Sequence, residues 1–503
     1  MSEALPGMPE PPPPRPPRDA AVVVLVRAGP EGREVFWLRR EMTLSFAAGF
    51  YAFPGGRVDA ADRRVAVQGA DGEEATLRVA AARELFEETG VLRARGAVGS
   101  AELLREARAA LLAGSRPFGE ILSGFGLTLH AEDFPFAGRW VTPAFLPVRF
   151  DARFFLVEVP PGTAAEVWPG ELAEGAWVRP EDALLAWTEG RALLHPPNQF
   201  TLETLLDAAS VEAARARMAE APPSEGPGAR PIEFQRGVRV LALRTPTLLP
   251  ATHTNCWVLG NGELLVVDPG APDPSEIDRL VAHLDGLGRA GLVPRAIFLT
   301  HHHLDHVGGV RQLSERLRLP IWCHPLTAER IGLRPGRVLA DGEVLTLEGS
   351  PDMQWRVLHT PGHARGHLCL VDEATRAAVV GDMVAGVGTI LIDPPEGEMA
   401  EYLRQLRRLR DLPVRALYPA HGPPLPDGPA ALEGYLAHRA AREERVRAAL
   451  QSEPRPLEEI SAEAYADTPT AWPPVAERST LAILEKLLAE GEARVEGEAW
   501  ARA

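Results

Sequence analysis

The feature that most constrains this chain is the run Thr300-His301-His302-His303-Leu304-Asp305-His306, which contains the pattern HxHxDH. The apolar residues 296–299 precede this run and predict a short buried strand. A tight loop after a strand end can direct alternate imidazoles at one point. Because neutral imidazole and carboxylate groups together suit zinc or another first-row metal, the run predicts a metal site.

Further potential ligands occur downstream, each at an expected loop position. They are His363 in the run TPGH, Asp382 directly after the apolar strand 378–381, and His421 in the run PAHG. Upstream, Asp268 follows the apolar residues 264–267. This recurrence favours a metal site over a solvated histidine-rich loop.

Taken in order, these five motifs resemble the metallo-β-lactamase superfamily over roughly residues 233–428. The resemblance implies one metal held by His301, His303 and His363, a second held by Asp305, His306 and His421, and Asp382 as a bridge between them. Asp268 would orient ligands through hydrogen bonds. The other nearby histidines, His302, His359 and His367, are expected to be structural or orienting residues and not ligands.

Length and composition constrain the cellular setting. A chain of 503 residues should contain two to four domains. No apolar run approaches the length of a membrane span, and the N-terminus lacks a signal-peptide core. Cys256, Cys323 and Cys369 show no paired spacing, which fits a reducing cytoplasm. We therefore expect a cytoplasmic protein without a membrane partner, whose net charge of -16 also argues against nucleic acid as a partner.

Proline- and glycine-rich segments predict the domain boundaries. Residues 1–18 are proline-rich and predict an extended or disordered tail. Residues 213–232 predict a linker. These segments divide the chain into a first domain at 19–212, a second at 233–428 and a C-terminal domain at 429–503.

A second metal site is predicted in the first domain. The run Arg83-Glu84-Leu85-Phe86-Glu87-Glu88-Thr89-Gly90 follows a lead-in rich in alanine, leucine and arginine, which predicts a helix ended by the glycine. Glu84, Glu87 and Glu88 then lie on one helix face. Three like charges on one face repel one another unless a cation lies between them. A Mg²⁺ or Mn²⁺ site is therefore favoured over a solvated acidic face.

This run resembles the Nudix box, whose enzymes cleave nucleoside diphosphates linked to other groups. Two departures are present. Ala75 occupies the position of the family's early glutamate, and about thirteen residues are inserted between Gly56 and Arg83. Such insertions occur in some Nudix enzymes, including relatives of the coenzyme A diphosphatases.

The segments 42–56, 140–143 and 149–155 look like that coenzyme A diphosphatase subgroup. Within the last segment, Arg149 and Arg153 would suit bidentate contacts to substrate phosphates. Pairing of these arginines with surface carboxylates is the alternative, and the sequence does not decide between the two.

The C-terminal segment predicts three helices and a ribbon. The run 432–445 is amphipathic, further helical patterns cover 457–465 and 479–490, and a short β-ribbon is expected at 493–500. The arrangement resembles the winged-helix region of the lactamase-β-like endoribonuclease group. Residues 429–503 contain fourteen acidic and nine basic side chains, so we expect a structural cap and not a tight nucleic-acid binder.

The predicted fold class is a multidomain α/β protein: a Nudix α/β/α sandwich, then a metallo-β-lactamase αββα sandwich, then a small winged helix. The predicted function is a bifunctional metal-dependent hydrolase of small molecules. Glu84, Glu87 and Glu88 would act with magnesium, and Asp305 would act with two zinc, iron or manganese ions that lower the pKa of a water between them.

Several alternatives stay open at this point. The second domain could hydrolyse a thioester or ester, like glyoxalase-II-like relatives, or single-stranded RNA, which the resemblance of the tail suggests. The Nudix domain could act on a nucleoside-diphosphate-linked compound of the coenzyme A type. It could also be a non-catalytic binding or sensing module, an alternative that Ala75 supports. The sequence does not indicate an oligomeric state.

Overall fold

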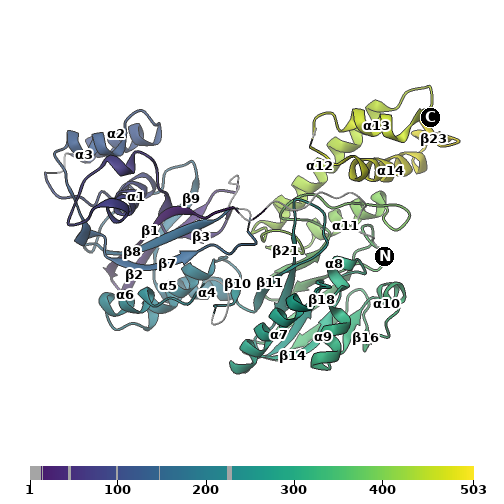
Figure 1. Cartoon of the computed structure of the whole chain (residues 1–503), viewed down its shortest axis with the longest axis horizontal. Coiled ribbons are helices and arrows are strands. Elements are labelled where there is room, and N and C mark those ends of the chain that lie inside the picture. Colours follow the sequence, from purple (N-terminus) through teal and green to yellow (C-terminus); the bar gives the residue numbers. More distant parts are fainter. Residues whose placement is uncertain are drawn as a thin grey trace. The chain divides into compact units, whose positions relative to one another are not determined.

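The computed structural model describes residues 13, 15–42, 47–97, 100–146, 148–223, 229–468 and 470–503. Most of the predicted proline-rich tail lies outside these residues. The chain divides near residue 236 into two compact units, each of which is described here by itself (Figure 1). No helix in the described ranges combines the length and the apolar character that a membrane crossing requires.

A mixed β-sheet forms the middle layer of the first unit. Its strands follow the order β3 (Tyr51–Ala52), β2 (Gly32–Arg40), β1 (Arg18–Gly29), β8 (Phe150–Glu158) and β7 (Phe136–Val141), with β4 (Gly55–Arg57) paired to β1 and β9 (Leu172–Val178) paired to β2. The central strand β1 is rich in valine, whose branched side chains favour strands, and it pairs in parallel with β8. A separate pair is formed by β5 (Val67–Gln68) and β6 (Leu129–His130).

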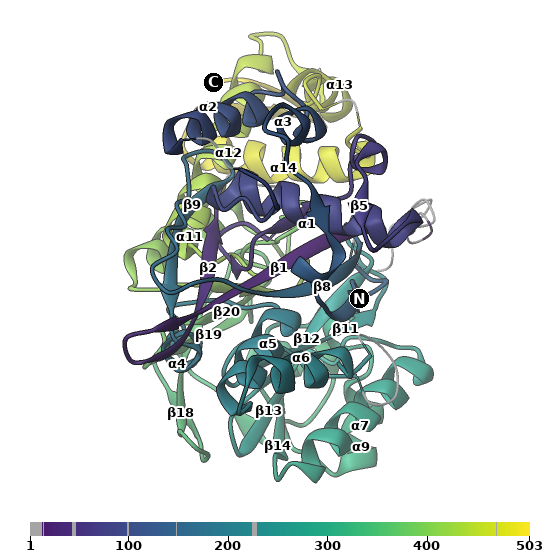
Figure 2. The same ribbon diagram turned by 90° about the vertical axis from the view of Figure 1, so that its left-hand side faces the viewer.

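Both faces of this sheet are covered, because successive side chains of β1 point to opposite sides. Val23 and Leu25 join one buried cluster with helices α1 (Gly72–Thr89), α2 (Ala101–Leu112) and α3 (Phe118–Gly124). Val24 and Val26 join another cluster with α4 (Pro180–Thr188), α5 (Pro196–Asp207) and α6 (Val211–Ala219). The two helix layers lie on opposite sides of the sheet in Figures 1 and 2, which is the predicted α/β/α sandwich.

The range predicted as a linker is partly ordered. Helix α6 extends into it, and Ala214 and Met218 of this helix are buried against the sheet. Strand β10 (Ile232–Gln235) follows, and Phe234 packs edge-on against the Phe50 ring. Residues 224–228 lie outside the described part of the chain.

Two sheets form the centre of the second unit. One contains β11 (Val238–Arg244), β12 (His253–Leu259), β13 (Glu263–Val267), β14 (Val293–Phe298), β15 (Ile321–Cys323) and β16 (Arg337–Val338) in that order. The other contains β17 (Val344–Leu347), β18 (Met353–His359), β19 (Leu368–Asp372), β20 (Ala378–Gly381) and β21 (Leu417–Pro419). The sheets meet through buried aromatic rings such as Trp257 and Tyr418, whose centroids are 5.1 Å apart.

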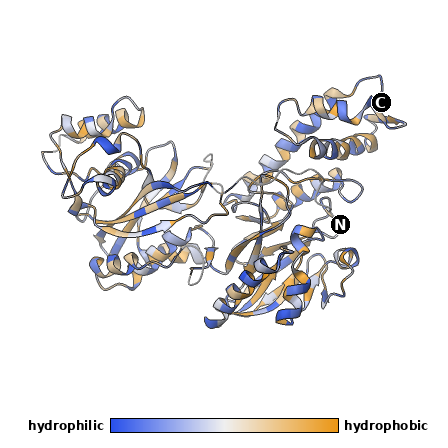
Figure 3. Ribbon diagram, viewed as in Figure 1, coloured by the Kyte–Doolittle hydropathy of each residue, from blue (hydrophilic) through white to orange (hydrophobic). Residues whose placement is uncertain are grey.

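Helices cover the outer faces of both sheets, as the αββα prediction requires. Helices α7 (Pro274–Arg289) and α9 (Val310–Leu317) cover the first sheet, and α11 (Met399–Asp411) covers the second. Leucine and isoleucine side chains of α7 are buried, and its other positions are mostly charged or polar. Figure 3 accordingly shows both colours along these helices. The short helices α8 (Leu304–Val307) and α10 (Pro325–Ile331) connect strands.

The C-terminal domain forms the predicted winged helix. It contains α12 (Gly428–Ala449), α13 (Leu457–Ala464) and α14 (Pro473–Ala489), followed by the ribbon β23 (Ala493–Glu496) and β24 (Ala499–Arg502), with β22 (Arg455–Pro456) paired to β24. Leu487 of α14 and Trp500 of β24 belong to the same buried cluster as Leu406 of α11 and Val380 of β20. The domain therefore shares one hydrophobic core with the second sheet.

This shared core predicts a stability effect for a substitution far from any candidate site. Leu487→Ala should lower the free energy of unfolding by about 2–5 kcal/mol, because it removes fully buried methyl groups and leaves a cavity. Leu488→Ala is the matched control on the same helix; this side chain is 42% exposed, so the change should cost about 0.5 kcal/mol or less. Urea denaturation followed by circular dichroism measures both, and equal losses would contradict the shared core.

Candidate metal centres

The sheet topology brings the predicted ligands of the second unit to one region. Strands β13 and β14 are parallel, and so are β20 and β21, so the loops after each pair leave the same sheet edge. The loop after β14 carries His301 and His303, and α8 carries Asp305 and His306. The loops after β18, β20 and β21 carry His363, Asp382 and His421. All seven predicted ligands lie in three overlapping groups of potential metal ligands.

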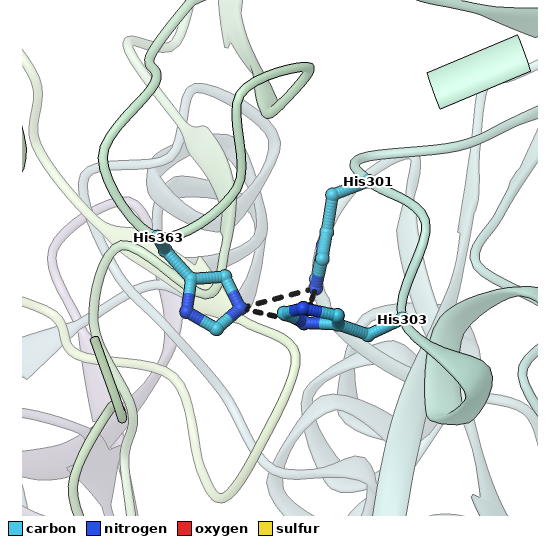
Figure 4. Close-up of side chains that lie close together, drawn as sticks. All are labelled: His301, His303 and His363. Atoms are coloured by element: carbon cyan, nitrogen blue, oxygen red, sulfur yellow. Dashed lines mark hydrogen bonds between the residues drawn. The ribbon is translucent and has the colours of Figure 1, made fainter. Parts of the chain in front are cut away.

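The first group consists of three imidazoles that point toward one another (Figure 4). His301 Nε2 lies 2.9 Å from His303 Nδ1, and His363 Nε2 lies 3.2 Å and 2.9 Å from these two atoms. His363 Nδ1 donates a hydrogen bond to the Leu391 carbonyl (2.8 Å), so its Nε2 presents a lone pair to the other rings. Convergence of ring nitrogens is the geometry in which a cation is bound.

The other two groups surround the carboxylates. Asp382 Oδ2 lies 3.4 Å from His363 Nε2, and its Oδ1 lies 3.5 Å from both His306 Nε2 and His421 Nε2. Asp305 Oδ2 lies 3.4 Å from His421 Nε2. Oδ2 of Asp382 therefore faces His363 of the first group, and Oδ1 faces His306 and His421 of the other two groups.

Buried polar atoms without partners show that these residues fit a metal. Within the described residues, His306 Nε2 and Asp382 Oδ1 are buried and form no hydrogen bond. An uncompensated buried donor or acceptor costs about 1–3 kcal/mol, so the protein alone does not satisfy this arrangement. Imidazole and carboxylate ligands suit zinc, iron or manganese, and the donor set therefore fits divalent metals of this kind.

The pKa shifts divide the predicted histidine ligands into two sets. Burial lowers the pKa of His301 and His303 well below the usual value, which leaves neutral, ligand-competent rings. Burial alone would raise the pKa of Asp305, but His306 and His421 lower it to about 2. The carboxylates are therefore ionised. Burial alone would lower the pKa of His306 and His421, but Asp382 and Asp305 raise it, so these two rings carry positive charge beside the carboxylates, where a bound cation would replace their protons.

Asp268 anchors the loop that carries the HxHxDH run. Its carboxylate accepts hydrogen bonds from the Thr300 N–H (2.8 Å) and hydroxyl (2.6 Å) and contacts His306 Nδ1 at 2.9 Å. The backbone φ of Asp268 is 50°, and a Cβ on Gly270 would lie 1.7 Å from the Asp305 carbonyl. Only glycine fits there, which explains the Asp-Pro-Gly turn in physical terms.

Two main-chain carbonyls that sequence reasoning did not identify orient further ligands. The Leu391 carbonyl receives the His363 hydrogen bond, and the His253 carbonyl lies 3.0 Å from His421 Nδ1. Such contacts fix the tautomer that presents Nε2 to a metal. Any residue has a carbonyl, so no sequence signal marks these positions.

The remaining histidines lie outside the ligand groups. His367 Nε2 accepts the Asp382 N–H (3.1 Å), and its Nδ1 contacts the Thr360 hydroxyl (2.8 Å), so both ring nitrogens are used. His302 Nδ1 lies 3.9 Å from a Glu396 oxygen. His359 Nε2 lies 2.8 Å from the Arg365 carbonyl.

Residues of the shared core hold the segment that follows Asp382. The Tyr435 hydroxyl of α12 accepts a hydrogen bond from the Ala385 N–H (2.7 Å) and donates one to the Ala385 carbonyl (2.9 Å). The buried Tyr402 hydroxyl donates to the Met383 carbonyl (2.7 Å). These bonds fix the main chain within three residues of a predicted ligand.

Arg439, one turn further along α12, holds the other end of this segment. Its buried guanidinium donates to the Ile390 carbonyl and lies over the Tyr402 ring, 5.2 Å from the centroid. The next residue, Leu391, orients His363. The C-terminal domain thus supports a segment that begins after Asp382 and ends beside the residue that orients His363.

The Nudix-like glutamates of the first unit lie on α1 beside β4. The Gly55 N–H donates to Glu88 (2.8 Å), and a Cβ on Gly56 would lie 2.3 Å from Glu84 Oε1. Burial raises the pKa of Glu84 to about 7 and raises that of Glu88 well above its usual value. Ionising these oxygen ligands without a cation is unfavourable, so their chemistry fits Mg²⁺. In the described ranges, Glu84, Glu87 and Glu88 do not form a three-ligand group within 4.8 Å.

Arg83 connects this acidic face to the inserted segment. Its guanidinium forms a buried bidentate ion pair with Asp62, with Nε and Nη2 each 2.9 Å from a carboxylate oxygen. Nη1 also donates to Glu84 (2.8 Å) and contacts Glu87 (3.3 Å). Asp62 lies in the short helix η1 (Asp62–Arg64) within the insertion, and sequence reasoning did not single it out.

Three other sequence-identified positions have structural contacts. Ala75 lies in the first turn of α1 and is buried in the core of the first unit. Arg153 pairs with Asp151 and lies 3.5 Å from Glu73. Arg149 donates to main-chain carbonyls of Thr142 and Arg15, at 3.0 Å and 3.1 Å. Phosphate binding by Arg149 and Arg153 stays a prediction.

The contacts of α12 predict an effect of the C-terminal domain on metal binding. Tyr435→Phe removes both hydrogen bonds to Ala385 and should weaken zinc binding by about tenfold, the order found for residues that support ligands. Tyr465→Phe makes the same chemical change in α13–α14 and should leave zinc affinity unchanged. Competition with a chromophoric chelator measures both affinities, and equal losses would show a general structural effect instead.

Comparison with known families agrees with the order of the domains. Residues 249–421 match the Metallo-beta-lactamase superfamily model, residues 16–117 match the NUDIX domain model, and residues 457–500 match the Beta-lactamase associated winged helix domain model. A NUDIX hydrolase structure from Alicyclobacillus acidocaldarius is 30% identical, with a TM-score of 0.35; the match covers 41% of this chain and 99% of that one.

Curated relatives match between 38% and 51% of the chain. Lactamase-like protein adaB of Aspergillus niger is 32% identical over 211 residues, which is 41% of this chain and 61% of that protein. The Atrochrysone carboxyl ACP thioesterase of Emericella nidulans is 34% identical over 38% of this chain and 59% of its own length. The Beta-lactamase-like protein 2 homolog of Drosophila melanogaster is 30% identical, and the match covers 51% of this chain and 89% of that protein. The chain therefore belongs to the metallo-beta-lactamase superfamily, with a NUDIX domain before the lactamase-like domain and a winged helix after it.

Proposed function

We propose that the chain is a bifunctional metal-dependent hydrolase, with a thioesterase or esterase activity in the lactamase-like domain and a diphosphatase activity in the NUDIX domain. The observation that carries the first part is the convergence of seven histidine and aspartate ligands around orphaned buried atoms. His301, His303 and His363 would hold one metal, and Asp305, His306 and His421 a second. Asp382, whose oxygens face different histidines, would bridge the two.

Zinc, iron or manganese fits these ligands, and such ions when bound polarise an acyl carbonyl and lower the pKa of a coordinated water. Other residues of the chain fix the positions of these ligands. Asp268 fixes His306, and the Leu391 carbonyl fixes the tautomer of His363. Asp305 stays ionised at neutral pH, because its neighbouring imidazoles keep its pKa low.

A thioester is favoured over RNA as the substrate for two reasons. A relative of 34% identity is named an acyl-carrier-protein thioesterase. Most basic residues of the C-terminal domain also pair with carboxylates. Within the domain these are Arg445, Arg447, Arg455, Lys486 and Arg494, and Arg478 pairs with Asp393 outside it. Phosphate-backbone binding relies on available positive charge, and this domain offers little.

For the NUDIX domain we propose Mg²⁺-dependent hydrolysis of a nucleoside-diphosphate-linked compound, such as one of the coenzyme A type. Glu84, Glu87 and Glu88 would supply the oxygen ligands. The Asp62 carboxylate supports catalysis over a purely sensing role, because it holds Arg83 and thereby the two glutamates that Arg83 contacts. Ala75 is buried and has no carboxylate to offer, so Asp62 supports the acidic face through Arg83.

The two proposed activities predict a double dissociation in the full chain. Glu88→Gln removes a charge from the Mg²⁺ ligands and should lower diphosphate hydrolysis by about 100-fold or more, with thioester hydrolysis unchanged. His303→Ala removes one imidazole of the first group and should do the reverse. Steady-state assays of coenzyme A and an acyl thioester, with metal content from elemental analysis, measure both effects.

Matched controls separate ligand loss from general damage. Glu74→Gln changes an exposed glutamate on the same helix, and His302→Ala changes the histidine beside His303 that lies outside the ligand groups. The Glu74 variant should keep both activities within about twofold, as is usual for surface changes. The His302 variant should retain its metal content, because it removes none of the grouped ligands. Loss of both activities from either ligand variant, with an unchanged melting temperature, would refute two independent sites.

A further inference from the structure

A cavity of about 270 Å³ lies beside the acidic face of the NUDIX domain, at the start of β1 and the turn after β4. Its lining consists of Arg18, Asp19, Arg57, Val58, Asp59 and Arg63. Three guanidinium groups therefore share one small cavity with two carboxylates. The cavity carries a net positive charge in a chain whose overall charge is -16.

The three arginines of this cavity lack partners. In the part of the chain that the structure describes, none of their side chains forms a hydrogen bond or an ion pair. Elsewhere in the same unit, Arg39 pairs with Glu174 and Arg139 with Asp151. The two carboxylates of the lining leave one positive charge unbalanced, so an anion in this cavity would be stabilised by the three guanidinium groups.

The wall of the cavity is connected to the catalytic face. The Arg57 carbonyl accepts a hydrogen bond from Arg83 Nη2 (2.8 Å), and the Asp59 N–H donates to Asp62 (2.8 Å). The same Arg83 contacts Glu84 and Glu87. A substrate whose diphosphate lies at the glutamates could therefore place a further group in this cavity.

We propose that this cavity binds a phosphate monoester of the substrate, separate from the diphosphate that is cleaved. Phosphate presents several anionic oxygens, and arginine presents a planar fork of donors, so one phosphate can bind two or more guanidinium groups. The inference rests on the proposed diphosphatase function and narrows its substrate class. The substrate is a nucleotide that carries both a diphosphate bridge and a phosphate monoester, as coenzyme A does.

Ligand binding tests the cavity without requiring turnover. Calorimetry of the full chain with Mg²⁺ compares adenosine 3′,5′-bisphosphate with adenosine 5′-monophosphate. The bisphosphate should bind at least about tenfold more tightly, given the strength of hydrogen bonds between charged groups. The double variant Arg57→Gln/Arg63→Gln should lose this preference, and Arg57→Lys/Arg63→Lys should retain most of it. The main-chain carbonyl at position 57 stays in every variant, so the Arg83 contact is preserved.

Arg64→Gln is the matched control, because Arg64 belongs to the same short helix as Arg63 and does not line the cavity. It should keep the full preference. Equal affinity of the wild type for the two nucleotides, or a preference that survives in the double glutamine variant, would overturn the proposal.

A kinetic comparison of coenzyme A with dephospho-coenzyme A separates this proposal from the proposed function. A bisphosphate preference without hydrolysis of either compound would refute the diphosphatase function and leave the phosphate subsite standing. Equal KM values together with equal binding of the two adenosine nucleotides would refute the subsite and leave the diphosphatase function standing.

Discussion

Both candidate centres depend on buried groups that are unfavourable together unless a cation joins them. At His306 and Asp382, one buried polar atom of each side chain forms no hydrogen bond. At the NUDIX face, burial raises the pKa of Glu84 and Glu88. The surrounding fold must therefore hold these side chains against their own repulsion. This requirement explains why so many hydrogen bonds, such as those of Asp268 and Arg83, end on ligands or their neighbours.

The parts of the fold that repeat a local pattern could be predicted from the sequence. Residues 20–26 of β1 and residues 296–299 before His301 are continuous apolar runs, and their length and branching indicate buried strands. The ligands of the second unit could also be identified, because four of them lie within one six-residue run. Their meeting with His363, Asp382 and His421 required the family resemblance, since no local rule relates loops that are up to 120 residues apart.

Other supports could not be predicted, because they are not properties of a residue type. The Leu391 and His253 carbonyls orient ligands, yet their side chains play no part in these bonds. Asp62 lies in an insertion without periodicity, and only the fold brings it to Arg83, 21 residues away. Helix α6 was not predicted for a different reason. Its alanine-rich sequence favours a helix, but the proline and glycine residues after it favoured a linker.

The C-terminal domain contributes both to the hydrophobic core of the second unit and to the position of the candidate metal ligands. Its helices complete the hydrophobic core of the second sheet, and Tyr435 and Arg439 of the same helix α12 hold residues 385–390, which follow Asp382 and precede Leu391, the residue that orients His363. A domain held only by a flexible connection could not position that segment, because each bond would have to offset the entropy of ordering the whole domain. Since burial of the core already orders α12, its polar contacts can act on the metal centre at little further entropic cost. Acidic charge on the domain is compatible with this role.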